Sequence, residues 1–345
     1  MTLDSLIKNI KWRLSKIFIS EKKRSWNNVK NQNKRFYNGE IIQLDEYSTE
    51  DALKQLENKR IVCIFDGKIK NGGLADRLRG IISIYKICKE QNLDLKIFFT
   101  SPFRLQEFLI PNKVDWTIGK DELNYNTTIT DLCYIDTKTG SAYEAKKQRE
   151  WFRREFKKKY MEFHVRTNAI FSYNEDYSTL FNELFKPSSR LQSSIEREKK
   201  MLGTSYISTS FRFMNLLGDF NETVELHKKL TKEEQNELII KNIKQLQLLH
   251  DKYPSKRILV NSDSATFLQT VAKLCYVYVI PGDITHIDGK NDSDEYNTYE
   301  KTFLDFYMIA NAEKIYLLRT GQMYNSGFPF AASKIYNRPF ERIEF

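Results

Sequence analysis

The amino-acid sequence predicts an α/β protein with two domains, each built around a parallel β-sheet. Its 345 residues, 41% of them hydrophobic, are enough for two domains that each bury a core. Short apolar runs alternate with longer segments of helical periodicity, an order typical of parallel sheets with helices on both faces. The alternation occurs twice, and a long charged segment at residues 141–200 separates the two series.

The first series begins with the apolar run IVCIF at 61–65, which predicts a strand. Residues 73–92 have apolar side chains at helical spacing, and LKIFF at 95–99 predicts a second strand. The segment 141–200 is charged and predicts helices. Its basic run at 146–160 fits a solvated helix face, with an acidic acceptor or a membrane contact as the alternative.

The second series follows residue 200. Apolar runs predict strands at 206–211, 257–261, 277–280 and 314–318. Helical stretches separate or follow them at about 231–251, 264–274, 298–311 and 327–336. We therefore expect an N-terminal domain over 41–200 and a C-terminal domain over 201–345, with the carboxyl ends of their strands around a shared cleft.

Residues 1–40 are a basic amphipathic segment. They hold ten basic residues against three acidic ones, so they supply seven of the ten net positive charges and leave the rest nearly balanced. That balance argues against a nucleic-acid-binding protein. An apolar stripe at helical spacing predicts either a peripheral membrane contact within residues 1–30 or a helix docked on the protein itself. Its members are Leu3, Ile7, Ile10, Leu14 and Ile17.

Neither a metal site nor an extracellular location is predicted. The four cysteines are far apart without a CxxC pair, which is typical of reduced thiols in a cytoplasmic protein, and the four histidines are scattered. No signal peptide or transmembrane run is apparent in the sequence. Asp292 and Asp294 match an Asp-x-Asp metal pattern, but their polar surroundings predict a solvated loop.

Loops that follow predicted strands carry the candidate binding residues. Glycines allow close approach of a ligand to the backbone, a helix start offers free N–H groups to phosphate, and arginine can grip two phosphate oxygens. Each feature also has a structural explanation, such as a tight turn, a helix cap or an ion pair between Arg212 and Asp219. The candidates are Gly72, Gly73, Ser210, Arg212, Ser262, Asp263, Ser264, Thr320, Gly321 and Gln322.

Four segments, in their order, resemble the superfamily of α-1,6-fucosyltransferases, nodulation fucosyltransferases and protein O-fucosyltransferases. They are NGGLADRLRGIISIYKICKEQNLDLKIFF, SYISTSFRFMN, ILVNSDSATFL and FLDFYMIANAEKIYLLRTGQMY. The resemblance covers about a third of the chain. It implies the GT-B fold, two Rossmann-like domains facing a cleft, and transfer from GDP-fucose without a metal or other cofactor.

The resemblance also implies roles for individual residues. Arg212 would bind the β-phosphate of the donor and Asp263 the guanine, while Thr320, Gly321 and Gln322 would hold the diphosphate. The sequence departs from the family pattern at three positions. Ser210 stands where the family has a histidine, Phe213 where some members have a second arginine, and Asn215 where an aspartate follows.

The function expected is that of an inverting glycosyltransferase that moves fucose onto a bacterial surface glycan or lipid-linked glycan. The candidates for the base that accepts the acceptor's proton are Asp76, Asp219 and His286. The alternatives are a nucleotide-binding protein of the same fold without transfer activity, and a transferase for another GDP-sugar. A membrane or nucleic-acid adaptor is a third class, supported by residues 1–40 alone.

Overall fold

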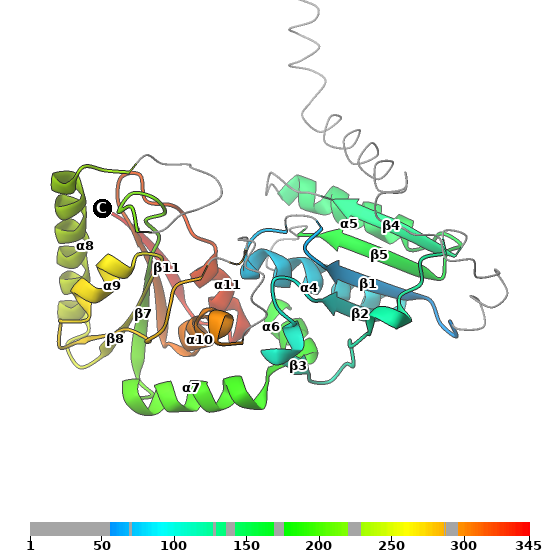
Figure 1. The fold of residues 1–345 in the computed structure, drawn as a ribbon, viewed down its shortest axis with the longest axis horizontal. Coiled ribbons are helices and arrows are strands. Elements are labelled where there is room, and N and C mark those ends of the chain that lie inside the picture. Colours follow the sequence, from blue (N-terminus) through cyan, green and yellow to red (C-terminus); the bar gives the residue numbers. More distant parts are fainter. Residues whose placement is uncertain are drawn as a thin grey trace, which may run out of the picture.

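Two parallel β-sheets, one in each half of the chain, form the framework of the molecule (Figure 1). The computed structural model describes residues 56–68, 71–126, 129–135, 142–168, 176–219, 229–285, 287 and 296–345. The first sheet has the order β2-β1-β5-β4, with every pair parallel. Its strands are β1 (Arg60–Phe65), β2 (Asp94–Phe99), β4 (Thr130–Ile135) and β5 (Glu162–Thr167).

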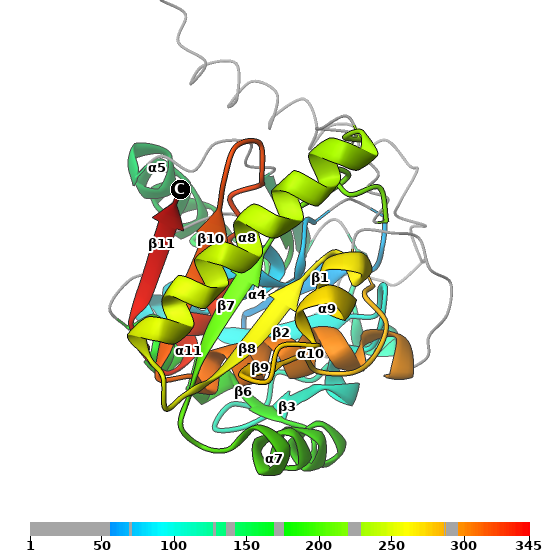
Figure 2. The ribbon, with the colours of Figure 1, turned by 90° about the vertical axis from the view of Figure 1, so that its left-hand side faces the viewer.

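The second sheet has the order β11-β10-β7-β8-β9 and is also parallel throughout. Figure 2 shows β10, β7 and β8 side by side, with α8 and α9 in front of them. Because β7 is central, the carboxyl ends of β10 and β8 flank its own. The strands are β7 (Tyr206–Phe211), β8 (Arg257–Ser262), β9 (Val277–Tyr278), β10 (Lys314–Arg319) and β11 (Phe340–Glu344).

Helices cover both faces of the second sheet. Successive side chains of β7 point to opposite faces of the sheet, and both faces are apolar. Ile207 packs in the core beneath α8 and α9, whereas Tyr206 packs in the core that includes α10 and α11. The capping residues that the sequence shows define where the helices begin: Thr231 and Glu234 form a capping box on α8. The helices are α8 (Lys232–Lys252), α9 (Ala265–Val271), α10 (Tyr296–Asn311) and α11 (Phe328–Ile335).

The first sheet differs from the expectation of helices on both faces. Its helices α4 (Leu74–Gln91) and α5 (Ala142–Glu155) share one core with Phe163 and Val165 of β5. On the opposite face, Val62 and Ile64 pack against Ile118, Leu123 and Tyr125. Within the described residues, the loop between β3 and β4 thus takes the place of a helix on that face.

Strand β5 corrects the prediction that residues 141–200 are helical throughout. Its sequence EFHVRT puts Glu162, His164 and Arg166 on one face, and all three are buried. Partners distant in the sequence make this burial tolerable. The Glu162 carboxylate accepts from Arg60 Nε at 2.5 Å and lies 2.6 Å from His164 Nε2, and Arg166 pairs with Asp66.

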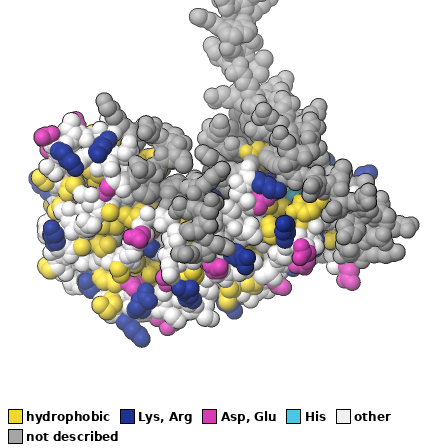
Figure 3. Space-filling model, viewed as in Figure 1, with side chains coloured by type: hydrophobic (Ala, Val, Ile, Leu, Met, Phe, Trp, Pro, Cys, Tyr) yellow, Lys and Arg dark blue, Asp and Glu magenta, His cyan; other side chains and the backbone are white. Residues whose placement is uncertain are grey.

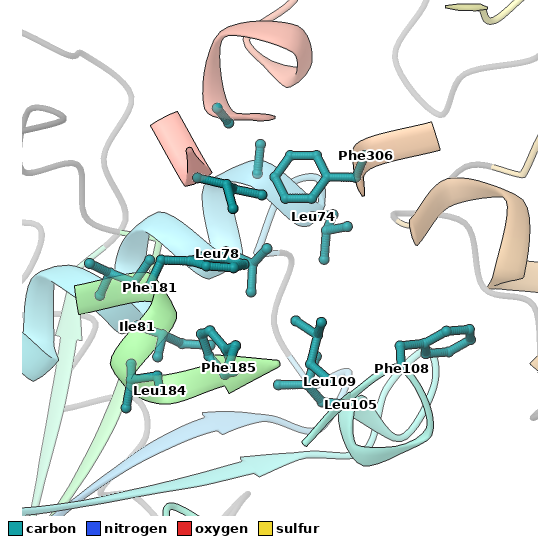
Figure 4. Packing of buried hydrophobic residues seen from close by; sticks show 14 of the residues in the cluster. Leu74, Leu78, Ile81, Leu105, Phe108, Leu109, Phe181, Leu184, Phe185 and Phe306 are labelled. Atoms are coloured by element: carbon teal, nitrogen blue, oxygen red, sulfur yellow. The ribbon is translucent and has the colours of Figure 1, made fainter. Parts of the chain in front are cut away.

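A shared core joins the two halves. Two helices, α6 (Tyr177–Leu184) and α7 (Ser189–Leu202), connect them, and a small antiparallel pair, β3 (Leu109–Pro111) with β6 (Phe185–Pro187), lies nearby. Figure 4 shows Leu74 and Leu78 of α4 in one cluster with Phe181 of α6 and Phe306 of α10. Stacked rings continue the cluster, with Phe108 and Phe303 centred 4.2 Å apart. The core therefore crosses the expected domain boundary near residue 200.

Candidate functional site

The carboxyl edge of the second sheet brings three of the predicted loops together. The chain leaves β7 at Arg212, β8 at Asp263 and β10 at Thr320, and these strands are direct neighbours. Main-chain contact confirms the proximity, since the N–H of Tyr324 donates to the carbonyl oxygen of Arg212 at 2.9 Å. The sequence placed these residues on separate loops, and the strand order places them at one edge.

Arg212 and Asp263 form an ion pair at this edge, with Arg212 Nη1 3.4 Å from Asp263 Oδ2. Asp263 also accepts from the backbone N–H groups of Phe213, at 2.8 Å, and Met214, at 2.7 Å. Met214 has a φ of +54°, so the carboxylate holds the loop after β7 in a left-handed turn. The Asp263 side chain is 2% exposed and that of Arg212 is 21% exposed. The guanidinium is thus the group of the pair that a ligand can reach.

Burial acts on the pKa of both members of this pair. It raises the pKa of Asp263 against the opposing charge of Arg212 and the backbone hydrogen bonds, and it lowers the pKa of Arg212 against the charge of Asp263. An arginine remains protonated in either case, because its ordinary pKa lies so high. The carboxyl edge of the second sheet therefore holds the charged guanidinium of Arg212 beside the loop that follows β7.

Asp219, Ser262 and Ser264 form a local network at the start of α9. The Oδ2 atom of Asp219 accepts from Ser264 Oγ and from the N–H of Thr266, both at 2.8 Å. The Ser264 hydroxyl in turn accepts from the N–H of Phe267 at 3.1 Å, and Ser262 Oγ accepts from the N–H of Ser264. These contacts give the three residues the geometry of a helix cap, and they tie the loop after β7 to the loop after β8.

The loop after β10 is held by two partners that the sequence did not suggest. Thr320 Oγ1 accepts from Lys241 Nζ of α8 at 2.6 Å and donates to the main-chain oxygen of Phe345. Gly321 has a φ of +56°, a conformation that favours glycine, and Gln322 is exposed. Lys241 therefore adds a second cation to the residues around this edge.

A buried polar cluster lies under the same edge, and only its member Ser210 was predicted from the sequence. Ser210 of β7 stands beside Asn261 of β8 in the strand register, and its buried hydroxyl has no hydrogen-bond partner among the described residues. Asn261 contacts Asp305 of α10, which pairs with Lys301 at 2.9 Å. Burial raises the pKa of Asp305, and Lys301 opposes the shift. The signal in the sequence was a Lys–Asp pair at i,i+4, with Asp305 inside the apolar run FLDFYMIA.

The glycine-rich loop of the first half lies between β1 and α4. Gly72 has a φ of +71°, and Gly73 precedes the first turn of α4. Asp76 is 43% exposed and pairs with Arg79 of the same helix at 2.6 Å. The buried Arg77 fastens the loop, because it donates to the carbonyl oxygens of Gly72 and Ser101, each at 2.8 Å.

A second ion pair, also missed from the sequence, fixes the start of this loop. Arg166 at the end of β5 binds both oxygens of Asp66, which follows β1, at 2.5 and 2.6 Å. Burial favours the protonated form of Asp66, but the hydrogen bonds and charge of Arg166 outweigh it, so the pKa of this carboxyl is lowered. The pair holds Asp66, the residue that follows β1, at the carboxyl edge of the first sheet.

Some predicted residues cannot be placed. His286, Asp292 and Asp294 lie outside the described residues, as do residues 1–40. Across the part of the chain that the structure describes, no group of three or more His, Cys, Asp or Glu side chains is arranged to hold a metal ion. In the same part, no helix is long and apolar enough to cross a membrane.

The arrangement of both sheets matches solved structures of fucosyltransferases. The NodZ α-1,6-fucosyltransferase soaked with GDP-fucose gives a TM-score of 0.52 at 14% identity, over 84% of this chain and 95% of that one. Fucosyltransferase NodZ from Bradyrhizobium gives a TM-score of 0.50 at 13% identity, over 80% and 92%. The chain has the GT-B fold of these fucosyltransferases.

The fucosyltransferase fold is thus confirmed for a sequence that shares little identity with its structural neighbours. POFUT1 in complex with GDP is similar as well, with a TM-score of 0.49 at 11% identity, over 83% of this chain and 99% of that one. No protein-family model and no curated protein sequence matches the chain. The two-domain α/β class predicted from the alternation of strands and helices agrees with this fold.

Proposed function

We propose that the protein is an inverting glycosyltransferase that transfers fucose from GDP-fucose without a metal ion. One observation carries the proposal: Arg212 stands at the carboxyl edge of β7, partly exposed and held by Asp263, in a fold shared with a fucosyltransferase that was soaked with GDP-fucose. In open α/β sheets, ligands bind at the carboxyl ends of the strands. The donor diphosphate would lie against this guanidinium.

Arg212 would act by stabilising the leaving group. As the bond between the sugar and the diphosphate breaks, negative charge accumulates on the diphosphate, and a guanidinium already fixed in place stabilises that charge without reorganising. Phe213 is fully buried in the core beneath α8 and α9, so the position that holds a second arginine in some fucosyltransferases supplies no cation here. Lys241, which donates to Thr320, is a further cation close to the loop after β10.

The nucleoside would occupy the part of the edge above Ser210 and Asn261. The unpartnered Ser210 hydroxyl, the Asn261 amide and the Lys301–Asp305 pair offer hydrogen-bond donors and acceptors in a buried setting. Asp263 was expected to bind the guanine, but both of its oxygens already accept hydrogen bonds from the loop after β7. The two roles can be separated by comparing GDP with IDP, which lacks the 2-amino group. Binding of guanine by Asp263 predicts that Asp263→Asn loses the preference for GDP.

Asp76 is the candidate that geometry favours for the base. Its carboxylate is 43% exposed in the first turn of α4, where it pairs with Arg79, whereas Asp219 uses Oδ2 to cap α9. In an inverting transfer the base takes the proton of the acceptor hydroxyl while the diphosphate departs on the opposite face. Asp76→Asn should abolish transfer and keep the affinity for GDP, and Asp219→Asn serves as the comparison. Normal turnover of both variants would assign the role to His286 or to the diphosphate itself.

Calorimetry of GDP binding with and without EDTA tests two parts of the proposal, that the donor nucleotide is GDP and that it binds without a metal ion. We expect binding of similar affinity in both conditions, and strict dependence on Mg²⁺ or Mn²⁺ would contradict the proposal. Release of GDP from GDP-fucose in the presence of glycan acceptors then separates a transferase from a nucleotide-binding protein of the same fold. Parallel assays with other GDP-sugars test the donor sugar. The acceptor we propose is a surface glycan or lipid-linked glycan reached from the cytoplasm.

A further inference from the structure

The positive charge of the chain is concentrated in two segments. Residues 142–160, which include α5, have eight basic residues against three acidic ones, an excess of five, and residues 1–40 have an excess of seven. Because the whole chain carries +10, the remaining residues have a net charge of −2. On the face seen in Figure 3, the described basic and acidic side chains are interspersed, as this balance requires.

The structure shows that α5 turns part of this charge toward solvent. Ala145, Phe152 and Phe156 are buried on one side of the helix. Two exposed basic side chains lie eight residues apart on the other side of α5, and two more lie in the turn that follows the helix. They are Lys146, Arg154, Lys157 and Lys159.

These four cations do not contribute ion pairs to the fold that the structure describes. Two neighbours have acidic partners: Arg153 pairs with Glu90 at 2.5 Å, and Lys158 pairs with Glu155 and lies 3.6 Å from Asp131. Lys59 Nζ donates to the carbonyl oxygens of Phe156 and Lys158 in the turn after α5. None of the four exposed cations makes an ion pair with a described residue.

We propose that this basic face of α5, defined by Lys146, Arg154, Lys157 and Lys159, docks the protein on an anionic phospholipid bilayer. Lys146 and Arg154 lie two turns apart on α5, about 12 Å along its axis, with the exposed Glu150 between them. Lys157 and Lys159 follow in the turn after the helix, so this surface presents four cations against one carboxylate. Among the α5 side chains that the structure describes, no aromatic one is exposed, so this part of the helix lacks the stacking platforms of single-strand nucleic-acid sites. The amphipathic pattern of residues 1–17 favours the same partner, because such patterns are typical of membrane-surface helices.

The location of α5 suits this role. It packs on the first sheet, in the half of the molecule that does not contain α8 or the carboxyl edge of the second sheet (Figure 1). Binding would be electrostatic and not insertive, because the apolar residues of α5 named above are buried in the core. It should therefore weaken steeply as the salt concentration rises.

Co-sedimentation of the full-length protein with vesicles tests the proposal. The vesicles contain phosphatidylglycerol and phosphatidylcholine, or phosphatidylcholine alone. The variant Arg154→Gln/Lys157→Gln/Lys159→Gln removes three charges from the basic face. The matched control, Lys232→Gln/Lys244→Gln/Lys273→Gln, removes three exposed lysines from the second half of the chain. Thermal unfolding and GDP binding confirm that both variants remain folded.

We expect the α5 variant to bind anionic vesicles about 100-fold more weakly, because each Lys or Arg near an anionic surface contributes about fivefold in affinity. The control should change binding less than about threefold, and Lys157→Arg should keep it. Equal losses in both triple variants would show that net charge alone matters, and an unchanged α5 variant would show that this face does not touch lipid. Loss of RNA binding with normal vesicle binding would assign the face to nucleic acid. Each of these three results would overturn the proposal.

Discussion

Replacing Asp263 with asparagine tests the idea that this carboxylate builds the phosphate-binding edge. Asparagine has the same shape but only one acceptor oxygen, whereas the wild-type side chain accepts from the N–H groups of both Phe213 and Met214 and pairs with Arg212. One of the two N–H groups would therefore face an amide that also donates. Arg212 would lose its negatively charged partner.

The expected loss of stability follows from these contacts. A buried N–H group left without an acceptor costs about 1–3 kcal/mol. The ion pair adds about 1–2 kcal/mol, a value between those of exposed and fully buried pairs, because the Arg212 side chain is 21% exposed and its Nη1 lies 3.4 Å from the carboxylate. The free energy of unfolding should fall by about 2–5 kcal/mol in total. Affinity for GDP should fall as well, since the loop that positions Arg212 would no longer be fixed.

Urea denaturation at neutral pH measures the first effect and calorimetry with GDP the second. Asp283→Asn is a suitable control, because Asp283 is exposed in the same half of the chain, and its effect should stay within about 0.5 kcal/mol. If Asp263→Asn lowered the free energy of unfolding by less than about 1 kcal/mol and bound GDP normally, the proposed role of Asp263 in holding the loop would be refuted.

Three further predictions concern other parts of the molecule. Arg212→Ala should lower turnover by roughly 10²–10³-fold in a folded protein, the scale of losing one preorganised donor to a developing anion, and normal turnover would exclude a contact with the diphosphate. Asp66→Asn should destabilise the protein by about 2–4 kcal/mol at neutral pH, because it breaks the pair with Arg166. Since the folded-state pKa of Asp66 is lowered, this contribution is present above its unfolded pKa of about 4 and is lost as the pH falls through the folded value, so wild type and variant should converge in acid-denaturation curves. Gly80→Ala should cost about 1–3 kcal/mol in urea denaturation, because its Cβ would lie 2.7 Å from the carbonyl oxygen of Thr167; an unchanged midpoint would show that the helix moves freely away from β5.

The sequence by itself determined where most strands and helices lie and which residues follow the strands. Apolar runs such as IVCIF and helix caps such as Thr231 are local signals, because hydrophobic periodicity and capping depend on residues close in the chain. The order of segments also carried the resemblance to fucosyltransferases, and the solved structures agree with the fold that it implied. Arg212 at the end of β7 was visible as an unusual charge after an apolar run.

Only the tertiary structure decided which of these residues meet. Arg212 pairs with Asp263 because β7 and β8 are neighbours, and Asp219 caps α9 because the loop after β7 folds back on the start of that helix. The strand β5 could not be distinguished from the charged helices around it, since the partners that allow its charges to be buried, such as Asp66, lie about a hundred residues away. The contact of Asp305 with Asn261 was hidden for the same reason, because Asn261 lies on β8 and Asp305 on α10. A charged side chain can be buried only where distant segments supply its partners, and these contacts cannot be predicted from local periodicity.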